Sequence, residues 1–330
     1  MAKARTVNLD DIAAATGFGR ATVARALSED NKYPMSVATR DAVRAAARAM
    51  GYAPTWGGRV LATGKTRQIG LIHAGKSPII TGILGQVLQT VPADLTDAGY
   101  RVMLVPVVED SDAWIGQVEG GGLDGCLILP PTAPTLGRAP LVPTVLINLQ
   151  MALGLPTVLA DDRGGAALLT RHLLGLGHRR ILFLHPEVPN RHYSAVQREA
   201  SYRESMMAAG AAGEVFAGSV GEAIAVCRRS EAPPTAVIAY DHYRAVELLH
   251  QFWRAGIRVP HDLSVACFNE VWPVEVSIPP LTTVKVPIRA MAHHAVRLLL
   301  DRLAGGQEDA ATVVLPEELV VRESTAPPKA

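Results

Sequence analysis

The chain has 330 residues, with 32 Lys and Arg against 31 Asp and Glu, 48% hydrophobic residues and 3 cysteines. This composition is typical of a soluble protein of two or three domains, and it excludes disordered, collagen-like and disulfide-stapled architectures. No apolar run approaches the roughly 18 residues that a membrane helix needs, and the polar N-terminus lacks the apolar stretch of a secretory signal, so we expect a cytoplasmic protein.

Charge is distributed unevenly along the chain. Residues 1–65 hold 10 basic and 5 acidic side chains, which leaves 22 basic and 26 acidic ones for residues 66–330. A basic head on a mildly acidic body indicates that the head contacts a polyanion while the body has another task. A merely solvated helical face explains the charge of the head about equally well at this point.

The first 50 residues have a helical pattern of short amphipathic segments rich in Ala and Arg, interrupted at Gly17, near Pro34 and at Gly51. Within them, residues 9–28 fit a helix-turn-helix, in which Gly17 permits the tight turn. The second helix then displays outward a set that suits base edges and phosphates, namely Arg20, Ala21, Thr22 and Arg25. An Ala-rich helical hairpin with incidental arginines is the alternative interpretation.

A glycine-bearing connector after Pro54 leads to Ile69, from which β-rich apolar runs alternate with helical stretches until about residue 303. This alternation predicts a parallel α/β sheet with helices on both faces. The pattern occurs twice, because TRQIGLIHAG matches GHRRILFLHP, and GLDGCLILP with LVPTVLINL matches PPTAVIAYD with DLSVACFNE. Since ligands of such sheets bind beyond the carboxyl ends of the strands, two facing halves predict a cleft lined by His73, Asn148, His185, Asp241 and Asn269.

Enzymes also use doubly wound sheets, but their sequence signatures are missing. GKT at 64–66 resembles the end of a phosphate-binding loop, yet Arg59 stands where the loop requires a glycine. The Asp161-Asp162 pair fits the N-terminal end of a helix better than a pair of catalytic carboxylates. We therefore expect no catalytic activity, no cofactor and no metal. The cysteines, which we expect to be reduced core residues, are Cys126, Cys227 and Cys267.

The order VNLDDIAAATGFGRATVARALS, TRDAVRAAARAMGYAP, a short connector and RQIGLI resembles the LacI/GalR-type (lactose-repressor) family of bacterial transcription regulators. Further matches follow in family order over essentially the whole chain, among them DDRGGAALLTRHLLGLGHRRI, AGIRVPHDLSVACFNE and LPEELVVRES. The resemblance implies an N-terminal all-α helix-turn-helix domain and an α/β body of two doubly wound parallel-sheet subdomains, like a periplasmic binding protein. It also implies a DNA-binding regulator, expected to be a repressor, whose operator affinity a small-molecule effector controls.

The same resemblance implies domain boundaries. It places a helix-turn-helix head at residues 1–53, a hinge at 54–66, and an effector-binding and dimerisation domain at 67–325. One subdomain is expected at about 67–155 with 283–305, and the other at 156–282 with the C-terminal segment.

Positions of the family's DNA interface carry over to Thr6, Arg20, Ala21, Thr22, Arg25, Gly58 and Leu61. The resemblance implies that Arg20, Ala21 and Arg25 read bases, and that Leu61 wedges into the central minor groove. Gly19 and Ala24 stand where the family commonly has serine, so two phosphate-directed hydroxyls are missing.

Two adjacent glycines in the hinge, Gly57 and Gly58, depart from the family. Each costs roughly 1 kcal/mol of helix propensity relative to alanine. We therefore expect the hinge helix to be unfolded off DNA. A simple flexible linker is the competing interpretation.

Family positions that line the effector cleft carry over to His73, Ser77, Asn148, Arg198, Tyr240, Asp241, Asn269 and Trp272. Asn269 stands where many members have aspartate, and Tyr240 replaces a common asparagine. With histidines and Arg198 nearby, we expect a cleft less negative than usual and an effector such as a sugar acid or sugar phosphate. We expect His185 and His192 to be surface or core histidines that do not contact the ligand. We expect Trp272 to pack within its loop rather than against a sugar.

The expected partners are a near-palindromic double-stranded operator, a second copy of the chain and a small-molecule effector, which is a sugar or a sugar acid or phosphate, with no membrane. On its operator the protein is expected at the nucleoid. No leucine-rich heptad tail follows RESTAPPKA, so we expect no coiled-coil tetramer. The alternatives are an effector-independent DNA-binding regulator and a solute-binding protein without regulatory role, and the basic head argues against the latter.

Overall fold

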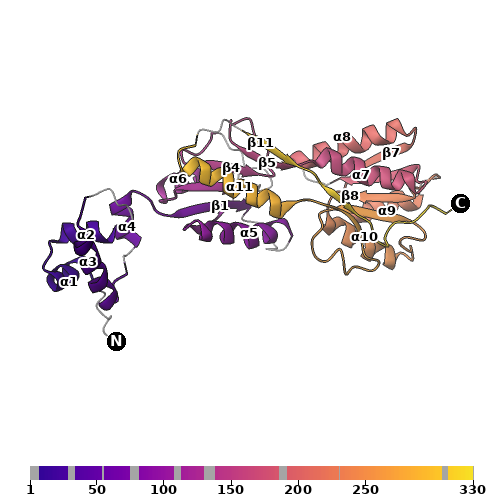
Figure 1. The fold of residues 1–330 in the computed structure, drawn as a ribbon. Coiled ribbons are helices and arrows are strands. Elements are labelled where there is room, and N and C mark those ends of the chain that lie inside the picture. Colours follow the sequence, from indigo (N-terminus) through magenta and orange to yellow (C-terminus); the bar gives the residue numbers. More distant parts are fainter. Residues whose placement is uncertain are drawn as a thin grey trace. The chain divides into compact units, whose positions relative to one another are not determined.

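A computed structural model describes residues 7–28, 34–53, 56–74, 82–107, 113–129, 138–185, 192–229, 231–306 and 311–329. The chain divides into two compact units, Met1–Thr66 and Arg67–Ala330, here called the head and the body. The head is helical and the body is α/β (Figure 1). In these described ranges, no helix has the length and apolar character needed to cross a membrane.

The head is a small helical unit with its own core. Its helices are α1 (Leu9–Thr16), α2 (Arg20–Leu27), α3 (Val37–Ala49) and α4 (Trp56–Thr63). Asn8 caps α1 and forms a reciprocal capping box with Asp11, and Gly17 ends this helix at φ 72°. The first three helices then bury one apolar cluster, which contains Ile12, Val23, Ala26, Val43 and Ala47. The predicted helix-turn-helix is therefore present as α1 and α2.

The hinge segment is helical in this structure, which differs from the expected unfolded segment. Helix α4 includes both Gly57 and Gly58. It ends at Gly64, which has a positive φ of 67° and whose N–H donates to the Val60 carbonyl over 2.8 Å. The two glycines lower helix propensity without removing any backbone donor, so they do not interrupt the helix.

The body contains two six-stranded sheets. The first has the order β11-β5-β4-β3-β1-β2 and is parallel throughout. Its strands are β1 (Gln68–Ala74), β2 (Arg101–Val107), β3 (Gly125–Ile128), β4 (Thr144–Ile147), β5 (Thr157–Ala160) and β11 (Thr312–Leu315). The second has the order β12-β10-β9-β8-β6-β7, with only β12 antiparallel to its neighbour. Its strands are β6 (Arg180–His185), β7 (Ala212–Ala217), β8 (Ala236–Ala239), β9 (Ser264–Phe268), β10 (Thr282–Lys285) and β12 (Glu318–Val320).

Helices cover both faces of each sheet, because the central strands are apolar along their whole length. These helices are α5 (Ile83–Asp97), α6 (Ala113–Gly120), α7 (Asp162–Gly175), α8 (Tyr193–Ala208), α9 (Val220–Arg229), α10 (His242–Arg254) and α11 (Ile288–Leu303). On the first sheet, α5 and α11 share one face and α6 packs on the other. On the second sheet, α9 and α10 share one face, and α7 and α8 the other.

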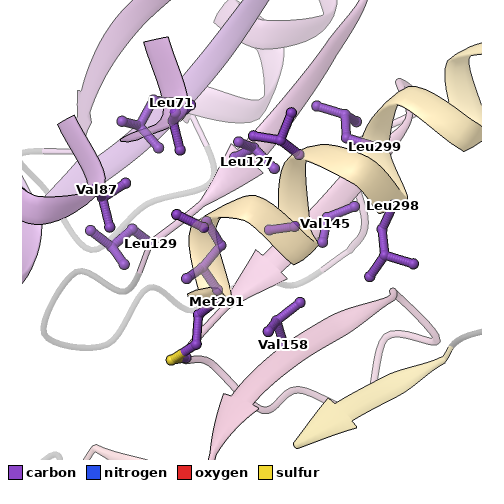
Figure 2. Close-up of a cluster of buried hydrophobic side chains, with 14 of the residues drawn as sticks. Leu71, Val87, Leu127, Leu129, Val145, Val158, Met291, Leu298 and Leu299 are labelled. Carbon is purple, nitrogen blue, oxygen red and sulfur yellow. The ribbon is translucent and has the colours of Figure 1, made fainter. Parts of the chain in front are cut away.

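Figure 2 shows how α11 completes the core of the first sheet, with Met291, Leu298 and Leu299 near Val145 and Val158. Helix α11 follows β10 of the second sheet in sequence, yet its apolar face packs on the first sheet. The first subdomain is therefore built from two distant parts of the chain.

The predicted internal duplication is confirmed by the sheet order. Strands β1 and β6 hold the same place in their sheets, as do β3 and β8, and β4 and β9. Each sheet thus repeats the order 2-1-3-4-5 of a doubly wound fold. The matched sequence segments fall on these equivalent strands, so the strand-end residues gather at the carboxyl edges of the two sheets.

The chain passes between the two subdomains at three crossovers: β5 to α7, β10 to α11, and β11 to β12. The expected boundaries at residues 155 and 283 differ slightly from these points, because β5 pairs with the first sheet and β10 with the second. The segment 312–315 also returns to the first sheet, where it pairs with β5. The three crossovers are called the hinge crossovers below.

Candidate functional site

Helix α2 presents a polar surface on the head. Arg20, Ala21, Ala24 and Arg25 are exposed, whereas Thr22 is half-buried. The Arg20 Nη1 atom lies 3.2 Å from Asp10 Oδ2, and both side chains are more than half exposed, at 68% and 61%. Such an exposed ion pair is weak, so Arg20 can exchange its partner for an external anion.

The first turn of α2 is open as well as basic. Its N-cap is Gly19, which has no side chain to accept from the first backbone N–H groups. These N–H groups and the positive end of the helix dipole suit a phosphate oxygen. Arg44 of α3 braces the other end of α2 by donating from Nε to the Ala26 carbonyl over 3.2 Å.

The remaining predicted DNA contacts are placed less fully. Gly58 is exposed on α4. Leu61 lies in α4, but its side chain is outside the described part of the structure. Thr6 also lies outside the described residues.

In the body, two asparagines occupy equivalent places at the ends of β4 and β9. Asn148 and Asn269 are both buried and both have positive φ, 53° and 75°. Each donates its backbone N–H to the neighbouring strand, to Val158 and Val284 respectively. The side-chain Oδ1 atom of each is buried, and it has no hydrogen-bond partner among the described residues. Buried acceptors left in this state are typical of positions that a ligand or water satisfies.

The guanidinium of Arg198 is buried and already engaged by protein groups. Its Nε donates to Asp162 Oδ1 over 2.7 Å, and Nη1 donates to the Tyr240 carbonyl over 3.0 Å. The guanidinium carbon lies 4.1 Å from the centre of the Phe268 ring and 5.1 Å from that of the Tyr240 ring. Burial alone would lower the pKa of Arg198, but the negative charge of Asp162 outweighs it, so Arg198 stays charged. Its charge is already balanced inside the protein.

A chain of hydrogen bonds joins the two subdomains beside Arg198. The Nε2 atom of His192 lies 2.8 Å from the Asn148 carbonyl, which only accepts, so Nε2 carries the proton. With His192 neutral, Nδ1 accepts from Ser194 Oγ over 2.7 Å, and Ser194 Oγ in turn accepts from the Tyr240 hydroxyl over 2.7 Å. Burial lowers the pKa of His192 and raises that of Tyr240, which keeps both groups neutral.

Acidic groups surround this cluster. Asp162 begins α7, and Asp161 caps it by accepting from the Gly164 N–H over 2.9 Å, as the sequence predicted for this pair. Burial raises the pKa of Glu317 to about 8, because little solvent or hydrogen bonding stabilises its charged form. The carboxylate of Asp162 thus balances the buried cation, so Arg198 leaves no uncompensated positive charge in the cleft.

Other predicted site residues lie around this cluster with different roles. Asp241 caps α10 by accepting from the Arg244 N–H over 2.9 Å. His185 is buried against the Tyr240 ring, with Nε2 3.3 Å from Glu199 Oε2. His73 lies half-buried at the end of β1.

Two predicted effector residues are not brought into the cluster. Trp272 is 69% exposed in the loop after β9. Ser77 lies outside the described residues. The structure also adds Ser194 and Glu317, which the sequence analysis did not select. Only the spacing of Ser194 from Arg198 on one helix face signalled its place, and no local signal marks Glu317.

No three His, Cys, Asp or Glu side chains are arranged to hold a metal ion in the described ranges. The three cysteines are free and buried, as expected.

Comparison with family models places this geometry among known proteins. Residues 8–55 match the model described as "Bacterial regulatory proteins, lacI family". Residues 170–325 match the periplasmic binding protein-like domain. These ranges contain the head helices α1 to α3 and most of the second subdomain.

Curated relatives and solved structures match over nearly the whole chain. The HTH-type transcriptional regulator CelR of Thermobifida fusca is 30% identical over 98% of this chain and 100% of its own length. The HTH-type transcriptional repressor CytR of Escherichia coli is 28% identical over 96% of each protein. A CelR–cellobiose complex superposes with a TM-score of 0.67 at 26% identity, covering 96% of this chain and 99% of that one. The lac repressor dimer bound to operator and the anti-inducer ONPF gives 0.80 at 22% identity, covering 98% and 100%, and supports the fold.

Proposed function

The chain belongs to the LacI family of bacterial regulatory proteins, and we propose that it represses transcription by binding a near-palindromic operator as a homodimer in the cytoplasm. Membership in the family makes it a helix-turn-helix transcriptional regulator. The observation that carries the proposal is the exposed basic surface of α2 on a separately folded head. Two-fold symmetry of a dimer would present two such helices to adjacent half-sites.

Within the head, we assign base reading to Arg20, Ala21 and Arg25, phosphate contact to Thr22 and Thr6, and the minor-groove contact to Gly58 and Leu61. The open first turn of α2 supplies phosphate-directed N–H groups, which replace part of what serines at positions 19 and 24 would provide. Arg25 is exposed near the end of α2 and can donate two hydrogen bonds to a guanine.

The effector is a neutral sugar in this proposal, bound beside Asn148, Asn269 and Arg198. Three buried acceptors have no hydrogen-bond partner in the described ranges and suit hydroxyl donors, namely Asn148 Oδ1, Asn269 Oδ1 and Asp162 Oδ2. Arg198 is engaged by Asp162, which leaves no uncompensated cation for a sugar acid or phosphate. The CelR–cellobiose complex supports a sugar of this class.

Operator binding is tested by fluorescence anisotropy of the full-length protein on DNA upstream of its own gene, with random competitor. We expect tight, competitor-resistant binding that Arg25→Ala weakens by about 1–3 kcal/mol, because one bidentate base contact is lost. Arg254→Ala, at an exposed arginine that ends α10 in the body, is the matched control. Equally weak binding to the upstream DNA and to random DNA would contradict sequence-specific recognition.

The effector class is tested by thermal-shift titration with cellobiose, gluconate and glucose 6-phosphate. The neutral sugar should stabilise the wild type, and Asn269→Ala should remove the shift while Trp253→Ala, at an exposed side chain, leaves it. Stabilisation by the acid or phosphate alone would overturn the assignment.

Two alternatives remain distinct from this proposal. An effector-independent regulator would bind the operator with no response to any sugar. A solute-binding protein would respond to ligand without operator binding. The separate basic head favours a regulator over the second of these.

A further inference from the structure

Glu317 occupies an unusual place in the body, on the crossover from β11 to β12. Its side chain is fully buried, and within the part of the chain that the structure describes neither carboxyl oxygen has a hydrogen-bond partner. The carboxyl group lies over Gly165 in the first turn of α7, so closely that a Cβ atom at this glycine would overlap Glu317 Oε2. Gly165, which has no side chain, therefore leaves the space that the Glu317 carboxyl group occupies.

The third crossover is tied to the other two. The Asp161 N–H, on the first crossover, donates to the Leu315 carbonyl over 2.8 Å. Strand β12 begins at Glu318, which pairs in register with Lys285 at the end of β10, directly before the second crossover. Glu317 therefore lies where all three hinge crossovers come together.

Charged and titratable groups face Glu317 from two helices. From α7 and its cap come the carboxylates of Asp161 and Asp162, and from α8 come Arg198 and the Tyr193 hydroxyl. Arg198 Nη2 is 3.7 Å from Glu317 Oε1, whereas Arg198 Nε is 2.7 Å from Asp162 Oδ1. The Arg198 guanidinium therefore pairs with Asp162 in preference to Glu317. A negative charge on Glu317 would be repelled by the nearby carboxylates of Asp161 and Asp162.

We propose that Glu317 is a proton-sensitive positioning residue of the hinge crossovers. It holds the three crossovers together when protonated and loosens them when ionised. Protonated, the carboxyl group rests on α7 without disturbing the Asp162–Arg198 pair. Ionised, it competes with Asp162 for Arg198 and is repelled by both aspartates. The raised pKa of Glu317, about 8, places this change just above neutral pH.

The consequence for regulation rests on the proposed function. If the arrangement of the two subdomains controls operator affinity, loosening the hinge crossovers distributes the molecules over more subdomain arrangements and lowers that affinity. The regulator would then respond to alkaline conditions independently of its effector.

The test starts with a readout that needs neither DNA nor effector. Infrared difference spectra of the full chain are recorded from about pH 6 to about pH 9, a range that spans the titration. The carbonyl band of a protonated carboxylic acid should be present at neutral pH, disappear on raising the pH, and be missing in Glu317→Gln. Glu318→Gln, at the exposed neighbouring residue, should keep the band. A wild-type spectrum without this band at neutral pH overturns the proposal, even if the glutamine variant does not fold.

Hydrogen exchange and operator binding complete the test. In wild type, amides in the first turn of α7 and in the third crossover should exchange faster at high pH than intrinsic rates predict, and Glu317→Gln should abolish the excess. Operator affinity should fall about fivefold over the same range in wild type, and stay constant in Glu317→Gln. If the band and exchange behave as expected but no operator is bound, the repressor proposal fails and the proton-sensitive hinge stands. Equal exchange in both proteins overturns the hinge role.

Discussion

His178 fastens the C-terminal segment to the second sheet through a buried set of hydrogen bonds. Its Nδ1 lies 2.8 Å from Thr235 Oγ1, and its Nε2 lies 2.9 Å from the Ala326 carbonyl and 3.1 Å from Ser264 Oγ. Because the Ala326 carbonyl only accepts, Nε2 carries the proton and Nδ1 accepts. Burial lowers the pKa of His178 below its ordinary 6.5.

This lowered pKa predicts a loss of stability in acid. As the pH falls below about 6.5, the unfolded chain takes up the proton before the folded one, so the free energy of unfolding decreases. His178→Gln should flatten this decrease, although it costs about 1–3 kcal/mol near neutral pH through broken buried hydrogen bonds. Urea unfolding followed by circular dichroism at several pH values measures both effects. His250→Gln, at an exposed histidine, should keep the wild-type slope, and a variant slope equal to wild type would contradict the role of His178.

Arg198 shows what residue-level reasoning could and could not provide. The sequence analysis assigned Arg198 and Asp162 to the second subdomain, where both lie, but it treated Arg198 as a donor available to the effector. The 2.7 Å pair between Arg198 and Asp162 joins two helices, and Glu317 approaches from a third segment of the chain. Contacts at such separations leave no local periodic signal, so the electrostatic balance of the site was not predictable.

At the level of elements, two glycines of α7, Gly165 and Gly175, differ in how closely other residues pack against them. Gly165 has Glu317 and Val284 against it, whereas Gly175 of the same helix has open space around its Cβ position. Gly165→Ala should therefore destabilise the body by about 1–3 kcal/mol through overpacking. Gly175→Ala, the matched control, should be neutral or stabilise by up to about 1 kcal/mol, since alanine favours helix. Thermal unfolding distinguishes the two, and equal effects would argue against the proposed contact.

Helix α4 carries a second prediction at this level. Gly57→Ala combined with Gly58→Ala should raise operator affinity and blunt release by the effector, because alanine favours the helical hinge by roughly 1 kcal/mol per site. The Cβ position at Gly57 is open, so alanine at that position adds no steric clash. Anisotropy titrations with and without effector measure both quantities. Unchanged affinity and response would identify the glycines as a plain linker.

Elements with strong periodic patterns were predictable, and those at the crossovers were not. The duplicated strands β1, β3 and β4 and their counterparts β6, β8 and β9 are continuous apolar runs, so both their type and their equivalence were visible in the sequence. The short strands β11 and β12 are only partly buried, and a few residues separate them. Their assignment to different sheets depends on long-range pairing, which explains why the sequence analysis did not place residues 312–315 in the first sheet.

For the whole molecule, the division into head and body predicts separable activities. A variant lacking residues 1–66 retains the compact body and should keep its thermal response to the effector while losing operator binding. The same thermal-shift and anisotropy assays serve here, with the full chain as control. Loss of the effector response on removing the head would contradict the independence of the two units.

The position of α11 has a consequence for the order in which the protein is made. The core of the first sheet lacks Met291, Leu298 and Leu299 until the ribosome has synthesised strands β6 to β10 of the second sheet. The head can fold as soon as it emerges, but the first sheet must wait with part of its apolar face uncovered. Chaperone dependence during translation should therefore concentrate in the first subdomain, although it begins earlier in the chain.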